Sequence, residues 1–154
     1  MTETVEDRLS SAGLSLPAAA APVASYVPTA RSGNLLFVSG QITTGPSGVE
    51  FIGRCGEQYG IDEGQAAARL CALNVLAQVK AALGSLEKVR RCLKLTGFVN
   101  STPDFTDHPK VINGASDIMI AAFGEKGRHA RAAVGVASLP LGVAVEVEAI
   151  FEVE

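Results

Sequence analysis

The sequence predicts a single α+β domain: one mixed β-sheet with two helices packed on one of its faces. After an N-terminal lead-in, segments of period-two and period-3.6 hydrophobicity follow in the order β-β-α-β-α-β-β. Hairpins at both ends of such an order, with the helices between them, are typical of one sheet covered on one side. The length of 154 residues suits one continuous core. We therefore expect an N-terminal extension over residues 1–23 and one domain over residues 24–154.

The lead-in contains two segments. Residues 3–13 are expected to form a short helix that ends at Gly13. Residues 14–33 are rich in Ala, Pro and Ser, which favours extended chain rather than a second domain. A further early strand is expected near residues 25–29.

The first strong strand is predicted over residues 34–39, between Gly33 and Gly40. Turn-forming residues follow up to Gly48, and residues 49–53 are expected to return as the hairpin partner of this strand.

The clearest helix is expected to begin at Asp62, with Gln65 in a capping-box position, and to end at Gly84. Its apolar stripe recurs at helical spacing, whereas Arg69, Gln78 and Lys80 fall outside that stripe. The stripe consists of Ala68, Ala72, Val75, Leu76, Val79 and Leu83.

A strand is predicted over residues 88–99 and a second helix after it. Asp107 or His108 can cap this helix, and Pro109 suits its first turn. Gly124 and Gly127 are expected to end it. The predicted buried stripe is Val111, Ala115, Ile118, Met119 and Ala122.

Two final strands are predicted, over residues 131–138 and 143–153, joined by the turn LPLG. Alternate residues of the last strand are apolar from Val143 to Val153, so one of its faces is expected to be buried. A sheet with both helices on one side leaves its other face open, and we expect that face to meet neighbouring subunits.

Composition excludes several classes of protein. The net charge is −3, with 13 basic and 16 acidic residues, which argues against nucleic acid as a partner. Four basic residues lie between Lys88 and Lys94, where a solvated strand start is expected. Cys55, Cys71 and Cys92 form no paired motif, so we expect reduced thiols and neither a disulfide nor a metal. No secretory signal or membrane-spanning segment is recognised, and the cytosol is the expected location.

Two charged residues near the C-terminal end are the candidates for chemistry. Arg131 lies at a strand start and Glu146 on the following strand. A planar guanidinium grips a small carboxylate through two parallel hydrogen bonds, and a nearby carboxylate can orient a water molecule. By local pattern alone, a strand-end arginine and a solvent-facing glutamate remain the plainer interpretation of both.

Several separated motifs resemble the YjgF/RidA family. RAAVGVASLPLGVAVEVEAI, starting at Arg131, is similar to its C-terminal signature, and NLLFVSGQI with the preceding Tyr26 is similar to its N-terminal one. GFVNSTPDF and Asn113 resemble the middle portion. The likeness spans roughly residues 24–154 in a consistent order.

The resemblance implies a chorismate-mutase-like α+β fold that assembles as a homotrimer with clefts between subunits. It also implies hydrolysis of reactive enamines and imines, such as 2-aminoacrylate, to 2-keto acids and ammonia, without a cofactor. Arg131 would then bind the substrate carboxylate and Glu146 would position water. Tyr26, Ser39, Gly40 and Asn113 would line the cleft. Each of these four also has a plain structural reading, as a packing aromatic, a strand end or a helix-surface amide.

Three departures from the family pattern keep alternatives open. Ala133 stands where the deaminase branch often carries Cys, and His129 stands where Pro is common. The loop over residues 102–110 is about four residues longer than in short members, as in a longer branch of the family. His129 can face the cleft as an acid, base or donor, or serve a structural role. The alternative function is a protein that binds a keto acid or another carboxylate in the same cleft without turnover; the ribonuclease label of some relatives finds little support in an acidic chain.

Overall fold

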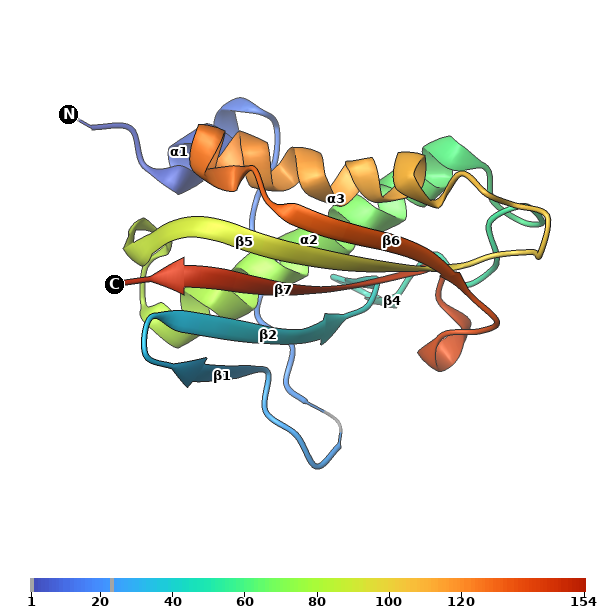
Figure 1. Ribbon diagram of the computed structural model, residues 1–154, viewed down its shortest axis with the longest axis horizontal. Coiled ribbons are helices and arrows are strands. Elements are labelled where there is room, and N and C mark those ends of the chain that lie inside the picture. Colours follow the sequence, from blue (N-terminus) through green and yellow to red (C-terminus); the bar gives the residue numbers. More distant parts are fainter. Residues whose placement is uncertain (1, 23) are drawn as a thin grey trace.

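The computed structural model describes residues 2–22 and 24–154, and it confirms the predicted α+β class. A five-stranded mixed sheet has the order β1-β2-β7-β5-β6. Both long helices lie on one side of this sheet (Figure 1). The strands are β1 (Thr29–Ser32), β2 (Leu35–Gln41), β5 (Val89–Asn100), β6 (Ala130–Val136) and β7 (Val145–Val153), and the long helices are α2 (Ile61–Leu83) and α3 (His108–Phe123).

The core lies between the sheet and the two helices. All pairings in the five-stranded sheet are antiparallel except β5 with β6, which run parallel because α3 crosses over between them. The predicted stripes of both helices are buried, as is the apolar face of β7 from Val145 to Val153. The period-two and period-3.6 patterns therefore identified the core correctly.

The start of α2 differs from the prediction. Its N-cap is Gly60, and the Glu63 side chain accepts a hydrogen bond from the Gly60 N–H at 3.4 Å. Asp62 is already inside the helix, and Gln65 donates instead to the carbonyl of Lys110 at 2.8 Å. Gly84, with φ of 83°, ends the helix as expected.

Helix α2 is long and apolar enough to cross a membrane by composition alone, and it is the one such helix among the described residues. Most of its apolar window, 61%, is buried inside the fold. Its neighbours there are α3 and β7. The apolar character of α2 is thus explained by its place as the central core helix.

Helix α3 begins at His108 with Pro109 in its first turn, as predicted. Asp107 occupies the N-cap position, but its side chain makes no capping hydrogen bond. The last turn ends at Phe123, and a 3-10 turn over Gly124–Gly127 follows.

Two strand predictions were wrong in detail. Strand β2 does not pair with residues 49–53; it pairs with β1 on one side and β7 on the other. The turn region after β2 forms its own small hairpin of β3 (Thr44–Gly45) and β4 (Gly48–Val49). The early strand is β1, a few residues later than expected. Because β7 supplies a long apolar partner, the short return after β2 is left outside the main sheet.

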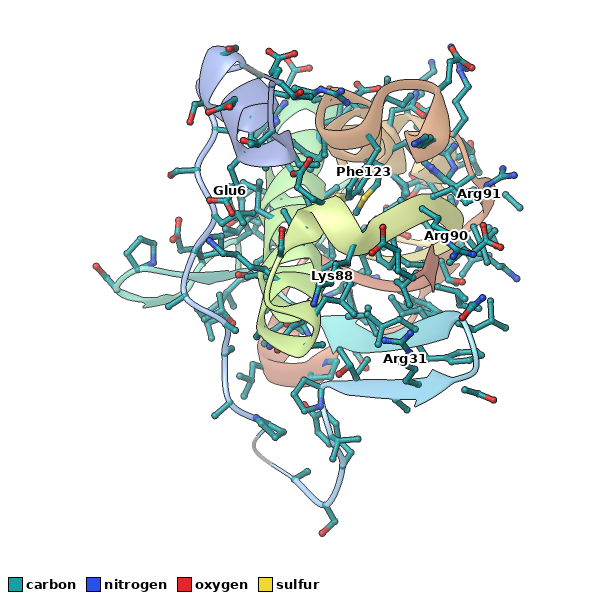
Figure 2. The ribbon with its side chains drawn as sticks, turned by 90° about the vertical axis from the view of Figure 1, so that its left-hand side faces the viewer. Glu6, Arg31, Lys88, Arg90, Arg91 and Phe123 are labelled. Carbon is teal, nitrogen blue, oxygen red and sulfur yellow. The ribbon has the colours of Figure 1, made fainter. Side chains whose placement is uncertain are left out.

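The N-terminal extension packs along the helices. Helix α1 (Val5–Ser11) buries Val5 and Leu9 and is joined to α2 by a Lys80–Glu6 ion pair of 2.8 Å. Figure 2 shows the lead-in descending beside α2 towards β1. It covers Gln78, which is 4% exposed and donates to the carbonyl of Ala20 at 2.7 Å. Gln78 was expected outside the buried surface, and the lead-in is the reason that it is buried.

The second face of the sheet is uncovered in the single chain. It presents the exposed side chains of Leu35, Phe37 and Val134 together with half-buried Phe98 and Ile150. Basic side chains lie at one end of the sheet, among them Arg31, Lys88, Arg90 and Arg91 (Figure 2). Strand β6 joins β5 only from Lys94 onwards, so the basic start of β5 is solvated as predicted.

Candidate functional site

Arg131 lies on the edge strand β6 and points to the helix side of the sheet. It is paired in parallel register with Leu95, whose side chain is fully buried. Its Nη1 donates to Asn113 Oδ1 at 2.8 Å and to Ser116 Oγ at 3.1 Å, and its Nη2 donates to the Pro109 carbonyl at 3.2 Å. All three partners belong to α3 and all are neutral. The guanidinium is therefore held in place without a carboxylate partner among the described residues.

His129 extends this network behind Arg131. Its Nε2 lies 2.9 Å from Ser116 Oγ, and its Nδ1 lies 2.6 Å from the Gly127 carbonyl. Burial lowers the pKa of His129, and the nearby Arg131 charge lowers it further, against the Gly127 hydrogen bond. A neutral ring satisfies every bond when Nδ1 donates to Gly127 and Nε2 accepts from Ser116. Both ring nitrogens are thus engaged within the chain, which favours a positioning role for His129 over an acid or base in the cleft.

Glu146 lies on β7 and points to the open face of the sheet. It is paired with Phe98 and lies over the irregular end of β2, where the register shifts between Val38 and Gln41. A Cβ at Gly40 would collide with Glu146 Oε1, so the glycine allows this carboxylate to keep its present position. Burial raises the pKa of Glu146, and the neighbouring Glu148 raises it further. No described residue donates a hydrogen bond to the Glu146 carboxylate.

Tyr26, Ser39 and Gly40 belong to the same end of the sheet as Glu146. Ser39 Oγ donates to the Val27 carbonyl at 2.7 Å, which ties the β2 end to the segment that carries Tyr26. Tyr26 is 47% exposed and lines, together with Gly40, a cavity of about 330 Å³. These three residues and Glu146 form one group, which we call the Glu146 group.

The predicted site residues therefore fall into two groups. Arg131, Asn113 and His129, with Ser116, form the Arg131 group at the β6–α3 edge. Arg131 neighbours Leu95 on the core side of β5, whereas Glu146 neighbours Phe98 on its open side. Strand β5 separates the two charged residues. A single chain holds them on opposite faces of the sheet, so it cannot bring both to one small molecule.

No metal or thiol chemistry is suggested by the described part of the chain. It contains no group of three His, Cys, Asp or Glu residues able to hold a metal ion. All three cysteines are free and buried. Burial raises the pKa of Cys55 to about 11 and that of Cys92 to about 12, and it raises the pKa of Cys71 as well, so each stays a neutral thiol at physiological pH.

The sequence did not reveal two contributors to these groups. Ser116 joins Arg131 to His129, and the only signal was its position three residues after Asn113, on the same face of α3. The Pro109 carbonyl comes from the first turn of α3, which begins within the segment over residues 102–110 that was expected to be a long loop. The start of α3 therefore bears directly on how Arg131 is presented.

The fold and the two groups define a class: an α+β protein that carries one cluster of candidate site residues on each face of one sheet. The sequence profile described as "YjgF/chorismate mutase-like, putative endoribonuclease" matches residues 6–152. The chain belongs to this YjgF/RidA family.

Individual relatives support this assignment. Protein TCP17 of Trypanosoma cruzi is 54% identical over 141 residues, which are 91% of this chain and 88% of that protein. The crystal structure of Atu1372 from Agrobacterium tumefaciens, of unknown function, has a TM-score of 0.92 at 50% identity and covers 97% of this chain and 92% of its own. Escherichia coli TdcF with bound serine has a TM-score of 0.64 at 28% identity, covering 88% and 94%.

Proposed function

We propose that this protein hydrolyses reactive enamines and imines of the 2-aminoacrylate type to 2-keto acids and ammonia, in the cytosol. Arg131 binds the substrate carboxylate, and Glu146 positions and activates the attacking water. The proposal rests mainly on one observation, that both charges are unpaired among the described residues. Arg131 is held in place without an acidic partner there, and half-buried Glu146 has no hydrogen-bond donor there. The family assignment and the serine bound by its relative TdcF support a small carboxylate as ligand.

The proposed cleft lies between two subunits of a homotrimer. The two groups lie on opposite faces of one chain, so a shared substrate requires the Arg131 group of one copy and the Glu146 group of the next. The open face supports such contacts because Leu35, Phe37 and Val134 are exposed on it. In a cyclic assembly the same pair of surfaces meets at every interface, which gives three equal clefts.

The chemistry needs no cofactor. 2-Aminoacrylate becomes an imine when a proton moves to its terminal carbon. The water oxygen then bonds to the electrophilic imine carbon, Glu146 accepts a water proton, and this proton passes to the nitrogen to give a tetrahedral amino alcohol. As its carbon–nitrogen bond breaks, the hydroxyl proton moves through Glu146 to the nitrogen, the carbonyl forms, ammonia leaves, and the 2-keto acid remains. Burial raises the pKa of Glu146, which makes its carboxylate a stronger base, and fixed positioning supplies the rest of the acceleration.

A turnover assay tests the reaction. 2-Aminoacrylate is generated by a PLP-dependent serine dehydratase, and keto acid release is followed with and without the protein. We expect faster release with the wild-type protein and none of this acceleration with Arg131→Ala at unchanged oligomer size. Release at the buffer rate across small and bulky imines would disprove the hydrolase.

A mixed-subunit experiment tests the inter-subunit cleft. Arg131→Ala and Glu146→Gln subunits are each inactive alone, and they are unfolded and refolded together in equal amounts. In a cyclic trimer, a cleft with both intact residues then arises in about one quarter of all interfaces, so about one quarter of wild-type activity should return. No recovery in a correctly sized mixed trimer would place both residues in one subunit's site.

The alternative is a carboxylate-binding protein that does not turn its ligand over. A binding protein of this kind would use the same cleft. The observation that favours it is Ala133, which stands where the deaminase branch of the family often carries Cys. A keto acid bound at Arg131, together with no turnover of any imine, would select it. Incubation with RNA beside Arg131→Ala checks the ribonuclease label of some relatives, which an acidic chain does not favour.

A further inference from the structure

The cavity of about 330 Å³ beside Gly40 has an apolar lining with a particular origin. None of its lining residues carries a charge. Its walls come from five places: the lead-in at residues 20–22, the end of β2 with the preceding Tyr26 and Pro28, the β3–β4 hairpin, helix α2 at Gln78, and the turn at Leu141. Gly40 forms part of the lining and also lies directly under Glu146 Oε1. Gly40 is therefore shared between the cavity lining and the surroundings of the carboxylate that we assign to water activation.

The two amide side chains in the lining, Gln41 and Gln78, are already engaged by the protein. Gln78 Nε2 donates to the Ala20 carbonyl at 2.7 Å and lies 3.4 Å from Gln41 Oε1. Gln41 Nε2 donates to the Ser39 carbonyl at 3.1 Å. A charged group entering this cavity would lose its hydration without meeting an oppositely charged residue in the lining. An apolar group would lose nothing and would bury surface.

Leu141 closes one side of the cavity in an unusual conformation. Its φ is 58°, a left-handed conformation that a leucine rarely adopts, and its side chain is 70% exposed in the single chain. The fold thus holds a large apolar side chain at the cavity at a conformational cost. Such strain is typical of positions that contribute to a site.

We infer that this cavity binds the side chain of the substrate, and that the protein acts on imines with an aliphatic side chain of four carbons in preference to 2-aminoacrylate. This inference rests on the proposed function and specifies its substrate class. The segment at residues 20–22, which the Gln78 bond fixes, together with Leu141, determines the preference. These residues shape the cavity and leave Arg131 and Glu146 to the reaction.

The expected size of the preference follows from the buried carbon. The imine of leucine has three more carbon atoms than 2-aminoacrylate, and each buried methylene contributes about fourfold in binding. The cavity has ample volume for four carbons. We expect kcat/KM for the leucine-derived imine to exceed that for 2-aminoacrylate by about 10- to 100-fold.

Filling the cavity should reverse this preference. The imines are generated by an L-amino acid oxidase from leucine and by a serine dehydratase from serine, with catalase present. Ala21→Phe should lower kcat/KM for the leucine-derived imine by about tenfold or more and leave 2-aminoacrylate turnover within about twofold. The matched control is Ala18→Phe, an exposed lead-in residue outside the cavity lining, which should change neither value. Equal losses for both imines in Ala21→Phe, or equal wild-type values for both, would overturn the inference.

A binding measurement separates this inference from the proposed function. If the protein turns over no imine, titration calorimetry with 4-methyl-2-oxopentanoate and pyruvate still compares a four-carbon side chain with a methyl group. Tighter binding of the larger keto acid by about tenfold, lost in Ala21→Phe and kept in Ala18→Phe, supports the cavity although the hydrolase has failed. Equal affinities would remove the cavity assignment, whatever the turnover result.

Discussion

Arg131 is fixed by three hydrogen bonds to α3, whereas Glu146 accepts no hydrogen bond from any described residue. Arg131 reaches its partners across the core side of the sheet edge, and Glu146 lies half-buried on the open side over Gly40. One group is oriented before a ligand arrives; the other is left with a raised pKa and free lone pairs. The difference suits the proposed roles of the two residues. Arg131 binds a carboxylate best when its geometry is fixed, whereas Glu146 can accept a proton from water because no hydrogen bond already occupies its oxygens.

The largest effect on activity should come from removing Arg131, the group that is held in fixed geometry. Arg131→Ala should lower kcat/KM by about 10³-fold, because a charge-assisted, bidentate contact to the substrate is lost. Arg131→Lys keeps the charge without the planar fork and should recover only part of the rate. Arg69→Ala, an exposed arginine on α2, is the control that should behave as wild type. A full rate in Arg131→Ala would show that Arg131 does not bind the substrate.

The second-largest effect on activity should come from replacing Glu146, whose carboxylate accepts no hydrogen bond from a described residue. Glu146→Gln should lower kcat by about 10²- to 10³-fold through the loss of the base. In the wild type, the rate should fall as pH drops through the Glu146 pKa, at a pH above the usual glutamate range because burial raises that pKa. A rate profile without an acidic limb due to Glu146, measured against Glu146→Gln, would contradict the assignment.

The same raised pKa also predicts a stability change of definite sign. A carboxyl whose pKa is raised on folding binds its proton more tightly in the folded state, so its ionised form disfavours folding. This penalty grows as pH rises from the unfolded pKa through the folded pKa. Glu146→Gln should therefore be inactive yet slightly more resistant to urea at pH 7.5, with the difference vanishing towards pH 4. A variant less stable than wild type at pH 7.5 would contradict this reading.

A smaller effect should follow from moving the carboxylate without removing it. In Gly40→Ala the new Cβ displaces Glu146 Oε1, and a misplacement of this kind should lower kcat by about 10- to 100-fold. Gly60→Ala is the matched control, because its Cβ would meet only Glu63 Oε2 at 3.7 Å. If both variants keep the wild-type kcat, the position of Glu146 over Gly40 has no part in catalysis.

The smallest effect on activity is expected for Ser116, which helps to orient Arg131. Ser116→Ala removes one of the three hydrogen bonds to Arg131 and the link from Arg131 to His129, and should raise KM by about three- to tenfold with kcat nearly unchanged. Ser116→Thr keeps the hydroxyl and should restore much of the affinity. A reduced kcat with an unchanged KM would show that Ser116 acts in the chemical step instead of supporting the clamp.

Hydrophobic periodicity predicted the class, both long helices and the core faces, because burial of these stripes is set by spacing within one segment. It did not predict the partner of β2. The partner is β7, more than one hundred residues later, and no local pattern distinguishes it from the nearer segment over residues 49–53. The start of α2 was misplaced for a related reason, since Glu63 and Gly60 form as good a local cap as the predicted pair.

The sequence motifs at Arg131 and Gly40 predicted the residues of the candidate site. They did not predict that these residues form two groups on opposite faces of the sheet. Opposite orientation of Arg131 and Glu146 depends on the parallel register of β6 with β5 and on the register shift in β2. Ser116 and Leu141 were missed because their parts in the site arise from contacts between distant elements and from one backbone angle. The residue types Ser and Leu alone indicate neither these contacts nor this backbone angle.

The central position of β7 has a consequence for how the chain folds. This strand follows all the others in the sequence, yet it lies between β2 and β5 and, within the described sheet, joins the β1–β2 hairpin to the β5–β6 pair. Until β7 has left the ribosome, the β1–β2 hairpin and the β5–β6 pair each keep an unpaired edge on the side where β7 belongs. Closing them requires contacts between distant parts of the chain, which makes folding slow and exposes both edges to aggregation. The order in which the strands are synthesised therefore makes completion of the sheet a late, single step.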